Sequence, residues 1–161
     1  MFSSRRIYDV KSLSVSEANQ IAQQCVCFNL RKTSRTISLK YDQALRPCGL
    51  RATQFFLLIE IKVQAPITIK QLAKKMSMHR TALARSLKAL EKKDLIKIEP
   101  GHDRRQRNIC LTHSGQKALV RAYPLWEYAQ RNVAKHFGKK QLNHLLSELS
   151  ALTVKFKNND T

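Results

Sequence analysis

The sequence predicts a mainly α-helical protein with one two-stranded β wing, in a chain of 161 residues that suits one domain with a helical extension. Over most of the chain apolar residues recur at steps of three and four, which is the period of an α-helix. Two short runs between residues 95 and 112 alternate instead, as strands do. Only four Gly and four Pro occur, which favours long helices over a sandwich of short strands.

The net charge of +19 is the strongest signal in the composition. A basic surface attracts polyanions, and phosphate backbones supply most nucleic-acid affinity through counterion release. A generally basic protein, or one that binds anionic membranes, remains an alternative on charge alone. Residues 70–114 hold 12 Lys and Arg against 4 Asp and Glu, about twice the positive density of the rest of the chain. We therefore expect the nucleic-acid surface in this segment.

Neither secretion nor membrane insertion is expected. The N-terminal residues contain no apolar leader, and the longest apolar stretch, FFLLIEIKV at residues 55–63, is short and interrupted by charges. The four cysteines lack the paired spacing of a metal site, so reduced thiols and a cytoplasmic location are expected.

Two helices are predicted in the first part of the chain. Residues 16–45 form one long helical pattern that ends at Pro47 and Gly49, and its face is marked by Cys27, Leu30, Ser34, Ile37, Tyr41 and Leu45. A second helix over residues 53–63 is dense in apolar residues, so we expect it to be nearly buried. Pro66 ends it.

A helix-turn-helix is predicted next. Thr68 and Gln71 have the spacing of a capping box before a short helix at residues 69–76. After a turn at residues 77–78, a second helix covers residues 79–93. One side of it carries Leu83, Leu87 and Leu90, and the opposite side, about 200° away around the helix, carries Thr81, Arg85 and Lys88.

A β-hairpin and two more helices complete the chain. The runs LIKIE and NICLT flank the basic segment PGHDRRQR, which predicts a wing with a basic tip. Thr112 caps the next helix, which contains Pro124. The last helix carries an apolar stripe without an obvious partner, which predicts dimerisation: Leu142, Leu145, Leu146, Leu149, Leu152 and Phe156.

The second helix of the helix-turn-helix contains the candidate base-reading residues, which are His79, Arg80, Thr81, Arg85 and Lys88. A helix in the major groove reads base edges through residues near its N-terminus, and Arg can pair with guanine through two hydrogen bonds. An ordinary solvated basic face is the alternative for such a stripe.

The wing contains the second group of candidates, Arg104, Arg105 and Arg107. Arginines suit a narrow minor groove and flanking phosphates. Asp103 would repel phosphate, so we expect it to form an ion pair that holds a wing arginine in position. A basic loop without fixed structure is the alternative.

The span LAKKMSMHRTALARSLKALEKKDLIKIEPGHDRRQRNICLTHSG resembles the DNA-binding core of the MarR family of transcription regulators. The resemblance rests on a helix-turn-helix followed by three short patterns: LEKKDLI at residues 90–96, DRR at 103–105 and LTHSG at 111–115. The flanking helices resemble the family's dimerisation helices, so the resemblance runs from about residue 17 to the end.

The resemblance implies roles for individual residues. Arg105 matches the arginine that the family places in the minor groove, and Asp103 matches its ion-pair partner. Thr81 and Arg85 match major-groove positions. The chain departs from the family at Asp94, where glycine is usual. It also departs at His79, where a small capping residue is common.

Cys27 is a candidate for redox sensing. Cys27 to Leu30 resembles the stretch at the reactive cysteine of OhrR-type peroxide sensors in this family. Such a thiol reacts only when its thiolate is stabilised and accessible. This chain has Arg31 where those sensors have tyrosine, and a small residue packed in the dimer helix is the alternative. The scattered histidines predict no metal site, and no spacing of residues predicts catalysis or a cofactor.

The sequence thus predicts a winged helix-turn-helix at residues 51–114, a helical dimerisation region at 17–50 and 115–157, and an N-terminal extension at 1–16. We expect a homodimer that binds double-stranded DNA at a pseudo-palindromic operator and acts as a repressor. A small-molecule effector or an oxidant would release it. A constitutive architectural DNA-binding protein is the alternative.

Overall fold

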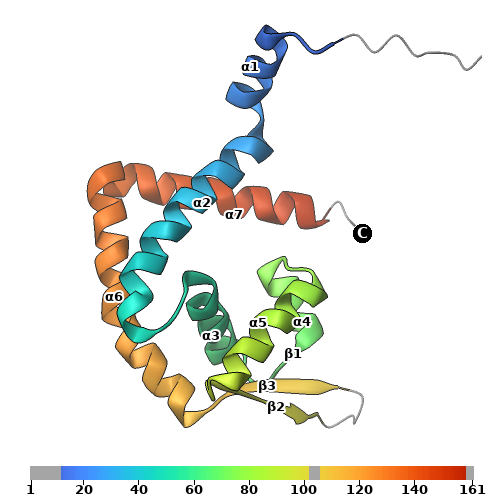
Figure 1. Cartoon of the computed structure of the whole chain (residues 1–161), viewed down its shortest axis with the longest axis vertical. Coiled ribbons are helices and arrows are strands. Elements are labelled where there is room, and N and C mark those ends of the chain that lie inside the picture. Colours follow the sequence, from blue (N-terminus) through green and yellow to red (C-terminus); the bar gives the residue numbers. More distant parts are fainter. Residues whose placement is uncertain (1–11, 102–105, 159–161) are drawn as a thin grey trace, which may run out of the picture. The chain divides into compact units, whose positions relative to one another are not determined.

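The computed structural model describes residues 12–101 and 106–158, with side chains up to residue 156 (Figure 1). The chain divides into two units, Met1–Leu39 and Lys40–Thr161. The described residues form seven α-helices, one short 3-10 helix (Arg46–Cys48) and three β-strands. The predicted fold class, mainly α-helical with a β wing, is confirmed.

The first unit begins with helix α1 (Val15–Gln24), which has a capping box. The Ser14 hydroxyl accepts a hydrogen bond from the Glu17 N–H at 3.2 Å, and the Glu17 carboxylate accepts one from the Ser14 N–H at 2.9 Å. Because the backbone and the hydroxyl of Ser14 both donate to this carboxylate, they lower the pKa of Glu17. Helix α2 (Val26–Leu45) follows.

The prediction of one uninterrupted helix over residues 16–45 is wrong. The backbone leaves helical geometry at Cys25, which has ψ 112°. The Asn29 amide stabilises the break, because its nitrogen lies 3.2 Å from the carbonyl oxygens of Ala22 and Gln23 and 3.0 Å from that of Cys25. A helix end leaves its last carbonyls without backbone partners, and this side chain donates to those of Ala22 and Gln23, whereas the Cys25 carbonyl also accepts from the Asn29 backbone N–H at 3.0 Å.

The second unit contains an antiparallel sheet in the order β1–β3–β2. Strands β2 (Ile96–Pro100) and β3 (Arg107–Leu111) form the predicted hairpin, with Ile98 opposite Ile109. A third strand, β1 (Ile67–Thr68), pairs with the other edge of β3, so the sheet is wider than the two-stranded wing that the sequence predicts. Two residues are too few to show an alternating pattern.

Helices α4 (Ile69–Met76) and α5 (Arg80–Lys92) form the predicted helix-turn-helix. Thr68 and Gln71 make the expected capping box at the start of α4. Ser77 then turns the chain in the left-handed conformation, with φ 49°. Three leucines of α5, each at most 1% exposed, anchor it to the core: Leu83, Leu87 and Leu90.

The chain leaves α5 through Asp94, which has φ 54° in the region that favours glycine. Its carbonyl accepts a hydrogen bond from the Thr112 hydroxyl at 2.6 Å. Its carboxylate accepts one from the Ser114 hydroxyl at 3.0 Å. These two contacts, with residues 18 and 20 positions later in the chain, stabilise Asp94 in a conformation that glycine adopts more readily.

We expect Gly115→Ala to destabilise the protein. Gly115 lies in the first turn of α6 (His113–Phe137), where an added Cβ would be 2.0 Å from the Leu95 carbonyl oxygen. The backbone would have to move, at a cost of about 1–3 kcal/mol, as in overpacked cores. Thermal unfolding should show Tm lowered by about 2–4 °C for each kcal/mol, the range for a chain of this size. The exposed change Lys117→Ala should leave Tm nearly unaltered, and an unaltered Tm for the glycine variant would contradict this packing.

Helix α6 crosses the core and carries aromatic contacts. Trp126 stacks on Phe55 of α3 (Ala52–Gln64) with ring centroids 6.4 Å apart, and Phe55 is 2% exposed. The Tyr41 hydroxyl donates to the Gln130 side chain, and burial raises the pKa of Tyr41. These contacts hold the end of α2, helix α3 and helix α6 together in the second unit.

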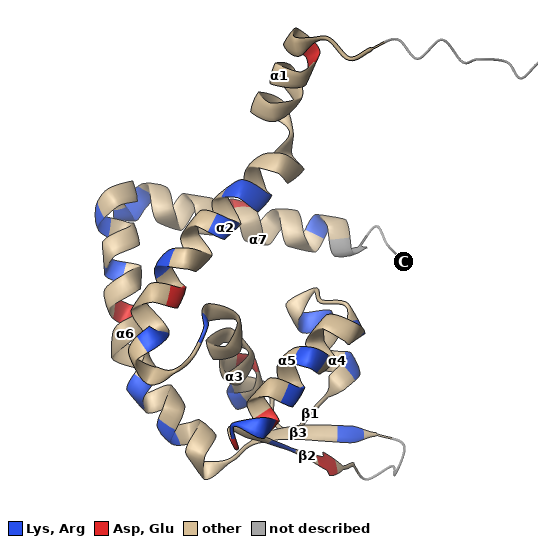
Figure 2. Cartoon of the chain, in the orientation of Figure 1, with Lys and Arg blue, Asp and Glu red and all other residues tan. Residues whose placement is uncertain are grey.

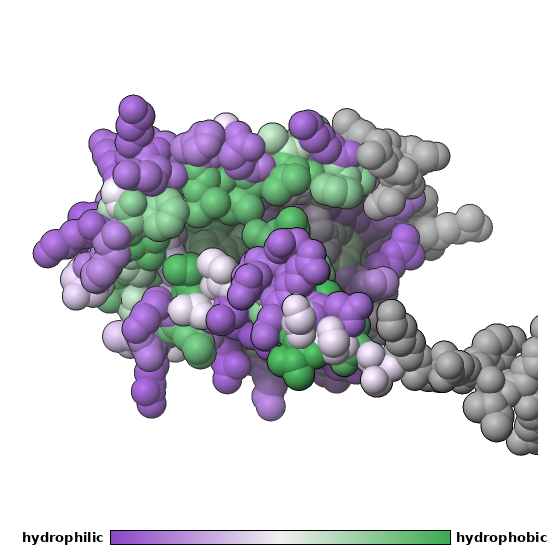
Figure 3. Space-filling model, turned by 90° about the horizontal axis from the view of Figure 1, so that it is seen from above, coloured by the Kyte–Doolittle hydropathy of each residue, from purple (hydrophilic) through white to green (hydrophobic). Residues whose placement is uncertain are grey.

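Helix α7 (Lys139–Asn158) packs against α6 and leaves most of its apolar stripe uncovered. Leu142 is buried, whereas the exposed fractions of Leu145, Leu146, Leu152, Val154 and Phe156 lie between 37% and 68%. Figure 3 shows hydrophobic residues exposed on this side of the molecule. An apolar stripe on a surface marks an interaction site.

Within the described ranges, no helix combines the length and the apolar character that a membrane span requires.

Candidate nucleic-acid interface

Helix α5 presents the predicted base-reading residues on its outer side. Because its leucines face the core, Thr81, Arg85 and Lys88 project the other way, and all three are exposed. His79 is the N-cap of α5, but its side chain makes no capping hydrogen bond. His79 and Arg80 are also exposed. The helix therefore offers side chains near its N-terminus without using them for its own stability.

A depression of about 600 Å³ connects the helix-turn-helix with the wing. Basic residues from three elements line it: Lys70 and Lys74 of α4, Arg80 of α5, and Arg107 of β3. Thr68, Ile69, Gln71 and Gln106 complete the lining. Several cations around one open depression suit an anionic group such as a phosphate.

A second depression of about 670 Å³ follows the turn between α4 and α5. Lys70, Lys74 and Arg80 line this depression as well, together with Ala73, Ser77, Met78, His79 and Thr81. The two depressions thus share Lys70, Lys74 and Arg80 and form one basic surface. Lys70 and Lys74 were not among the candidate DNA-binding residues that the sequence predicts. Their signal was present, since Lys70 and Lys74 are four residues apart on the side of α4 away from buried Leu72.

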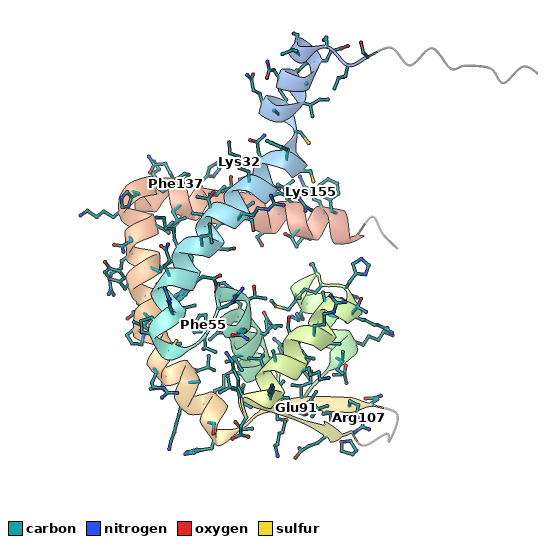
Figure 4. All side chains as sticks on the ribbon, in the orientation of Figure 1. Lys32, Phe55, Glu91, Arg107, Phe137 and Lys155 are labelled. Atoms are coloured by element: carbon teal, nitrogen blue, oxygen red, sulfur yellow. The ribbon has the colours of Figure 1, made fainter. Side chains whose placement is uncertain are left out.

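The wing contributes Arg107, which is exposed at the start of β3 and lies at the outer end of the strand in Figure 4. Lys97 of β2 is already paired, because its Nζ lies 2.6 Å from Oε1 of Glu99. The hydrogen bond and the charge of Glu99 raise the pKa of Lys97. The Gly101 N–H donates a hydrogen bond to the Gln106 carbonyl at 2.8 Å, which joins the residue after β2 to the residue before β3.

Three predicted wing residues, Asp103, Arg104 and Arg105, lie outside the described residues. Their predicted roles in the minor groove and in an ion pair stay predictions.

The charge distribution matches a surface for polyanions. Helices α4 and α5 carry seven Lys and Arg and one acid, Glu91. In Figure 2 the blue basic residues recur along both helices and again near the outer end of β3. Positive charge on adjacent elements raises the local concentration of phosphate groups.

Cys27, the candidate for redox sensing, belongs to the first unit. It is exposed near the start of α2. The four cysteines are free thiols, and the described residues contain no group of His, Cys, Asp and Glu placed to hold a metal ion.

Comparison with known proteins connects this surface with one family. The sequence model of the MarR family matches residues 50–106. SarZ of Staphylococcus haemolyticus, an HTH-type transcriptional regulator, is 33% identical over 91 residues, which cover 56% of this chain and 62% of SarZ. The matches span 62–64% of the length of three such curated relatives.

Solved structures match over more of the chain. The M. tuberculosis transcriptional regulator MosR, crystallised in complex with DNA, is 32% identical with a TM-score of 0.76, covering 84% of this chain and 98% of MosR. A mutant MarR from E. coli, complexed with operator DNA, has a TM-score of 0.74 at 22% identity over 88% of this chain and 99% of that one, which shows a shared fold. The match at residues 50–106 covers the helix-turn-helix, and the likeness to MosR extends to the helices around it, so this chain belongs to the MarR family of transcription regulators.

Proposed function

We propose that the protein is a sequence-specific repressor that binds a pseudo-palindromic operator as a homodimer. Each subunit places α5 in the major groove and the wing in the adjacent minor groove. The observation that carries this proposal is the shared depression in which Lys70, Arg80 and Arg107 meet, because it joins the helix-turn-helix and the wing into one basic surface.

The comparisons support duplex DNA as the ligand. MosR, a relative of similar length, was crystallised with DNA. Arg85 lies in the second turn of α5, where a side chain can reach a base edge, and the basic residues of α4 can contact phosphates.

The exposed stripe of α7 supports a homodimer. Leu145 and Leu152 are each 37% exposed, and Phe156 is 68% exposed. A second copy of the chain would cover these apolar side chains. It would also supply the second recognition helix that a pseudo-palindromic operator requires.

Selection of bound sequences from a pool of random duplexes tests this proposal. A specific regulator enriches one inverted repeat, with affinity about 10³-fold or more above that for random DNA at the same salt concentration. An architectural protein without sequence preference enriches none. Absence of enrichment would therefore contradict the proposed function.

Lys70→Ala is expected to weaken DNA binding by a similar factor for every duplex sequence. Lys70 lines both depressions and belongs to the phosphate-binding part of the surface. Removing one phosphate contact should reduce the slope of log affinity against log salt by about one. Fluorescence anisotropy over a range of salt concentrations measures this slope. The exposed Lys140→Ala of α7 serves as a control of equal charge change, and an unaltered slope for the Lys70 variant would contradict its role.

The Cys27→Ser variant tests whether an oxidant releases the protein from operator DNA. The Arg31 that replaces the sensors' tyrosine stands four residues after Cys27 on α2, and no hydrogen bond joins these two described side chains. We expect peroxide to leave the operator affinity of the wild-type protein unchanged, with Cys27→Ser behaving identically. Peroxide-induced release that the Cys27→Ser change abolishes would instead establish an oxidant as the signal.

A further inference from the structure

The outer side of the long helix α6 carries a second basic surface, which we call the α6 stripe. It is defined by the four Lys and Arg of this helix, all of them exposed: Lys117, Arg121, Arg131 and Lys135. With 3.6 residues per turn, these four side chains fall within about 80° around the helix and extend over about 27 Å along it. Charges that only keep a surface solvated would spread over the whole exposed side of the helix. The alignment therefore indicates an elongated anionic partner.

The α6 stripe contains groups that contact phosphates. The other residues within the same arc of the helix are His113, Pro124 and Tyr128, and all three are exposed. Tyr128 is 59% exposed, and its hydroxyl forms no hydrogen bond with a described residue. Lysine, arginine and tyrosine side chains are common phosphate contacts in protein–DNA complexes.

The arc lacks the side chains that anchor proteins and membranes. It contains no leucine, isoleucine, valine or phenylalanine, and Val120 lies beyond its edge. The buried centre of a protein interface is apolar, and a helix that lies on a membrane inserts apolar side chains. The composition of the stripe therefore favours a nucleic acid over these two partners.

The protein leaves the α6 stripe largely unneutralised. Within the stripe, Arg131 forms the one described ion pair, 3.7 Å from Glu127, which is the only acidic residue of α6. Lys117, Arg121 and Lys135 have no acidic partner among the described residues. Lys117 and Arg121 are four positions apart, as are Arg131 and Lys135, and like charges at this spacing repel each other. An anion bound along the stripe relieves this repulsion.

The α6 stripe faces away from the DNA-binding surface. Ala118, Leu119 and Ala122 occupy the other side of α6 and are at most 8% exposed, so that side packs against the core. Helix α3 contacts both α6 and α4, and in Figure 1 it lies between α6 and α5. Figure 2 shows blue residues along α6 from its end near the sheet to its junction with α7. A straight duplex held by α5 therefore does not reach the stripe.

A second copy of the chain does not suit the α6 stripe, because a protein with a net charge of +19 repels its own basic surface. The apolar surfaces that a second copy could cover lie elsewhere. One is the stripe of α7. The other is the outer side of α3, where Phe56, Ile59 and Val63 are 39%, 36% and 69% exposed although the sequence predicts near-complete burial. We therefore expect the α6 stripe to stay accessible in the proposed dimer.

We propose that the α6 stripe binds a second segment of duplex DNA, so that the protein joins its operator to another segment. Duplex DNA presents one negative charge per about 1.7 Å of its axis, which matches a straight row of cations. Phosphate contacts carry no sequence information, so the second segment can have any sequence. The bridging role rests on the function proposed above, whereas duplex binding by the stripe does not.

Capture of a second duplex by an immobilised operator complex tests the bridging role. A biosensor surface carries a selected operator saturated with the full chain, free protein is washed away, and a duplex of unrelated sequence is added. Arg121→Gln combined with Lys135→Gln should weaken this capture by about tenfold or more at about 0.1 M salt, because two phosphate contacts are lost. Operator affinity should be nearly unaltered. A wild-type complex that captures no second duplex would overturn the proposal.

A matched control removes the same charge from α7. Lys140→Gln combined with Lys155→Gln changes two exposed positions outside the stripe, and this variant should capture the second duplex as the wild type does. An equal loss of capture in the control would show that total charge holds the duplex, and it would overturn the assignment to the stripe. Thermal melting checks that both variants are folded.

Phosphatidylserine vesicles and polyglutamate, added in place of the second duplex, test the other classes of anionic partner. We expect neither to bind the operator complex as tightly as the duplex does. Binding of either one that the Arg121 and Lys135 changes abolish, without capture of duplex DNA, would overturn the proposal and assign the stripe to that partner.

A variant with a disabled helix-turn-helix surface separates this inference from the proposed function. Lys70→Glu combined with Arg85→Glu is titrated with duplexes of random sequence, so no operator is needed. This variant should keep weak, salt-dependent duplex binding that the added Arg121→Gln and Lys135→Gln changes abolish. Loss of all duplex binding before those changes, or residual binding that they leave unaltered, would overturn the inference. If selection finds no operator, the proposed function fails, whereas this titration still decides whether the stripe binds duplex DNA.

Discussion

Replacing Leu145 and Leu149 with aspartate is expected to convert the dimer into a monomer and to weaken operator binding by about 10²–10⁴-fold. Both residues belong to the apolar stripe of α7, where Leu145 is 37% exposed and Leu149 is half-buried. Buried carboxylates without partners oppose association. A monomer binds one half-site and lacks the gain in operator affinity that two linked recognition helices provide. Sedimentation velocity and anisotropy titration measure the two effects.

The opposite side of α7 supplies a matched control. Asn143 and Ser147 are exposed and lie away from the apolar stripe, and their joint change to aspartate adds the same charge. This control variant should remain dimeric and should keep most of its operator affinity. A dimer that survives the Leu145 and Leu149 changes would contradict the proposed interface.

Arg85→Ala is expected to weaken operator binding by about 1–3 kcal/mol and to relax the preference at one base pair. Arg85 is exposed on the outer side of α5, opposite the buried leucines. Affinities for operators changed at each position, measured for the wild type and the variant, identify the base pair that Arg85 reads.

Lys92→Ala provides the comparison for Arg85. Lys92 lies two turns later on the same side of α5, at its C-terminal end. Removing the Lys92 side chain should weaken DNA binding less than Arg85→Ala does, and by the same factor for every operator sequence. A loss of affinity at Arg85 that is uniform across sequences would assign Arg85 to a phosphate and not to a base.

Local sequence signals predicted most of the second unit. The capping box at Thr68 and Gln71 placed the start of α4, and the Thr112 cap placed the start of α6, as the structure confirms. The alternating runs placed the hairpin within one residue of β2 and β3. These features depend on neighbours within a few residues, so the sequence contains the information that determines them.

The features that the sequence did not predict depend on contacts between distant residues. Strand β1 exists because two residues pair with β3, at partners 40 and 42 positions later. The grouping of Lys70 with Arg107 requires α4 to lie beside the wing. The exposure of Phe56 depends on what the neighbouring elements cover, which periodicity alone does not show. The break at Cys25 is stabilised by one side chain, Asn29, that donates to three carbonyls.

The mass of the complex on a selected operator shows whether the protein binds DNA as a dimer. Sedimentation equilibrium with a labelled duplex counts the chains bound. We expect two chains on a full operator whose inverted half-sites are centred about 10–10.5 base pairs apart, or a multiple of that spacing, and much weaker binding to a single half-site. One chain on the full operator, with equal affinity for the isolated half-site, would contradict it.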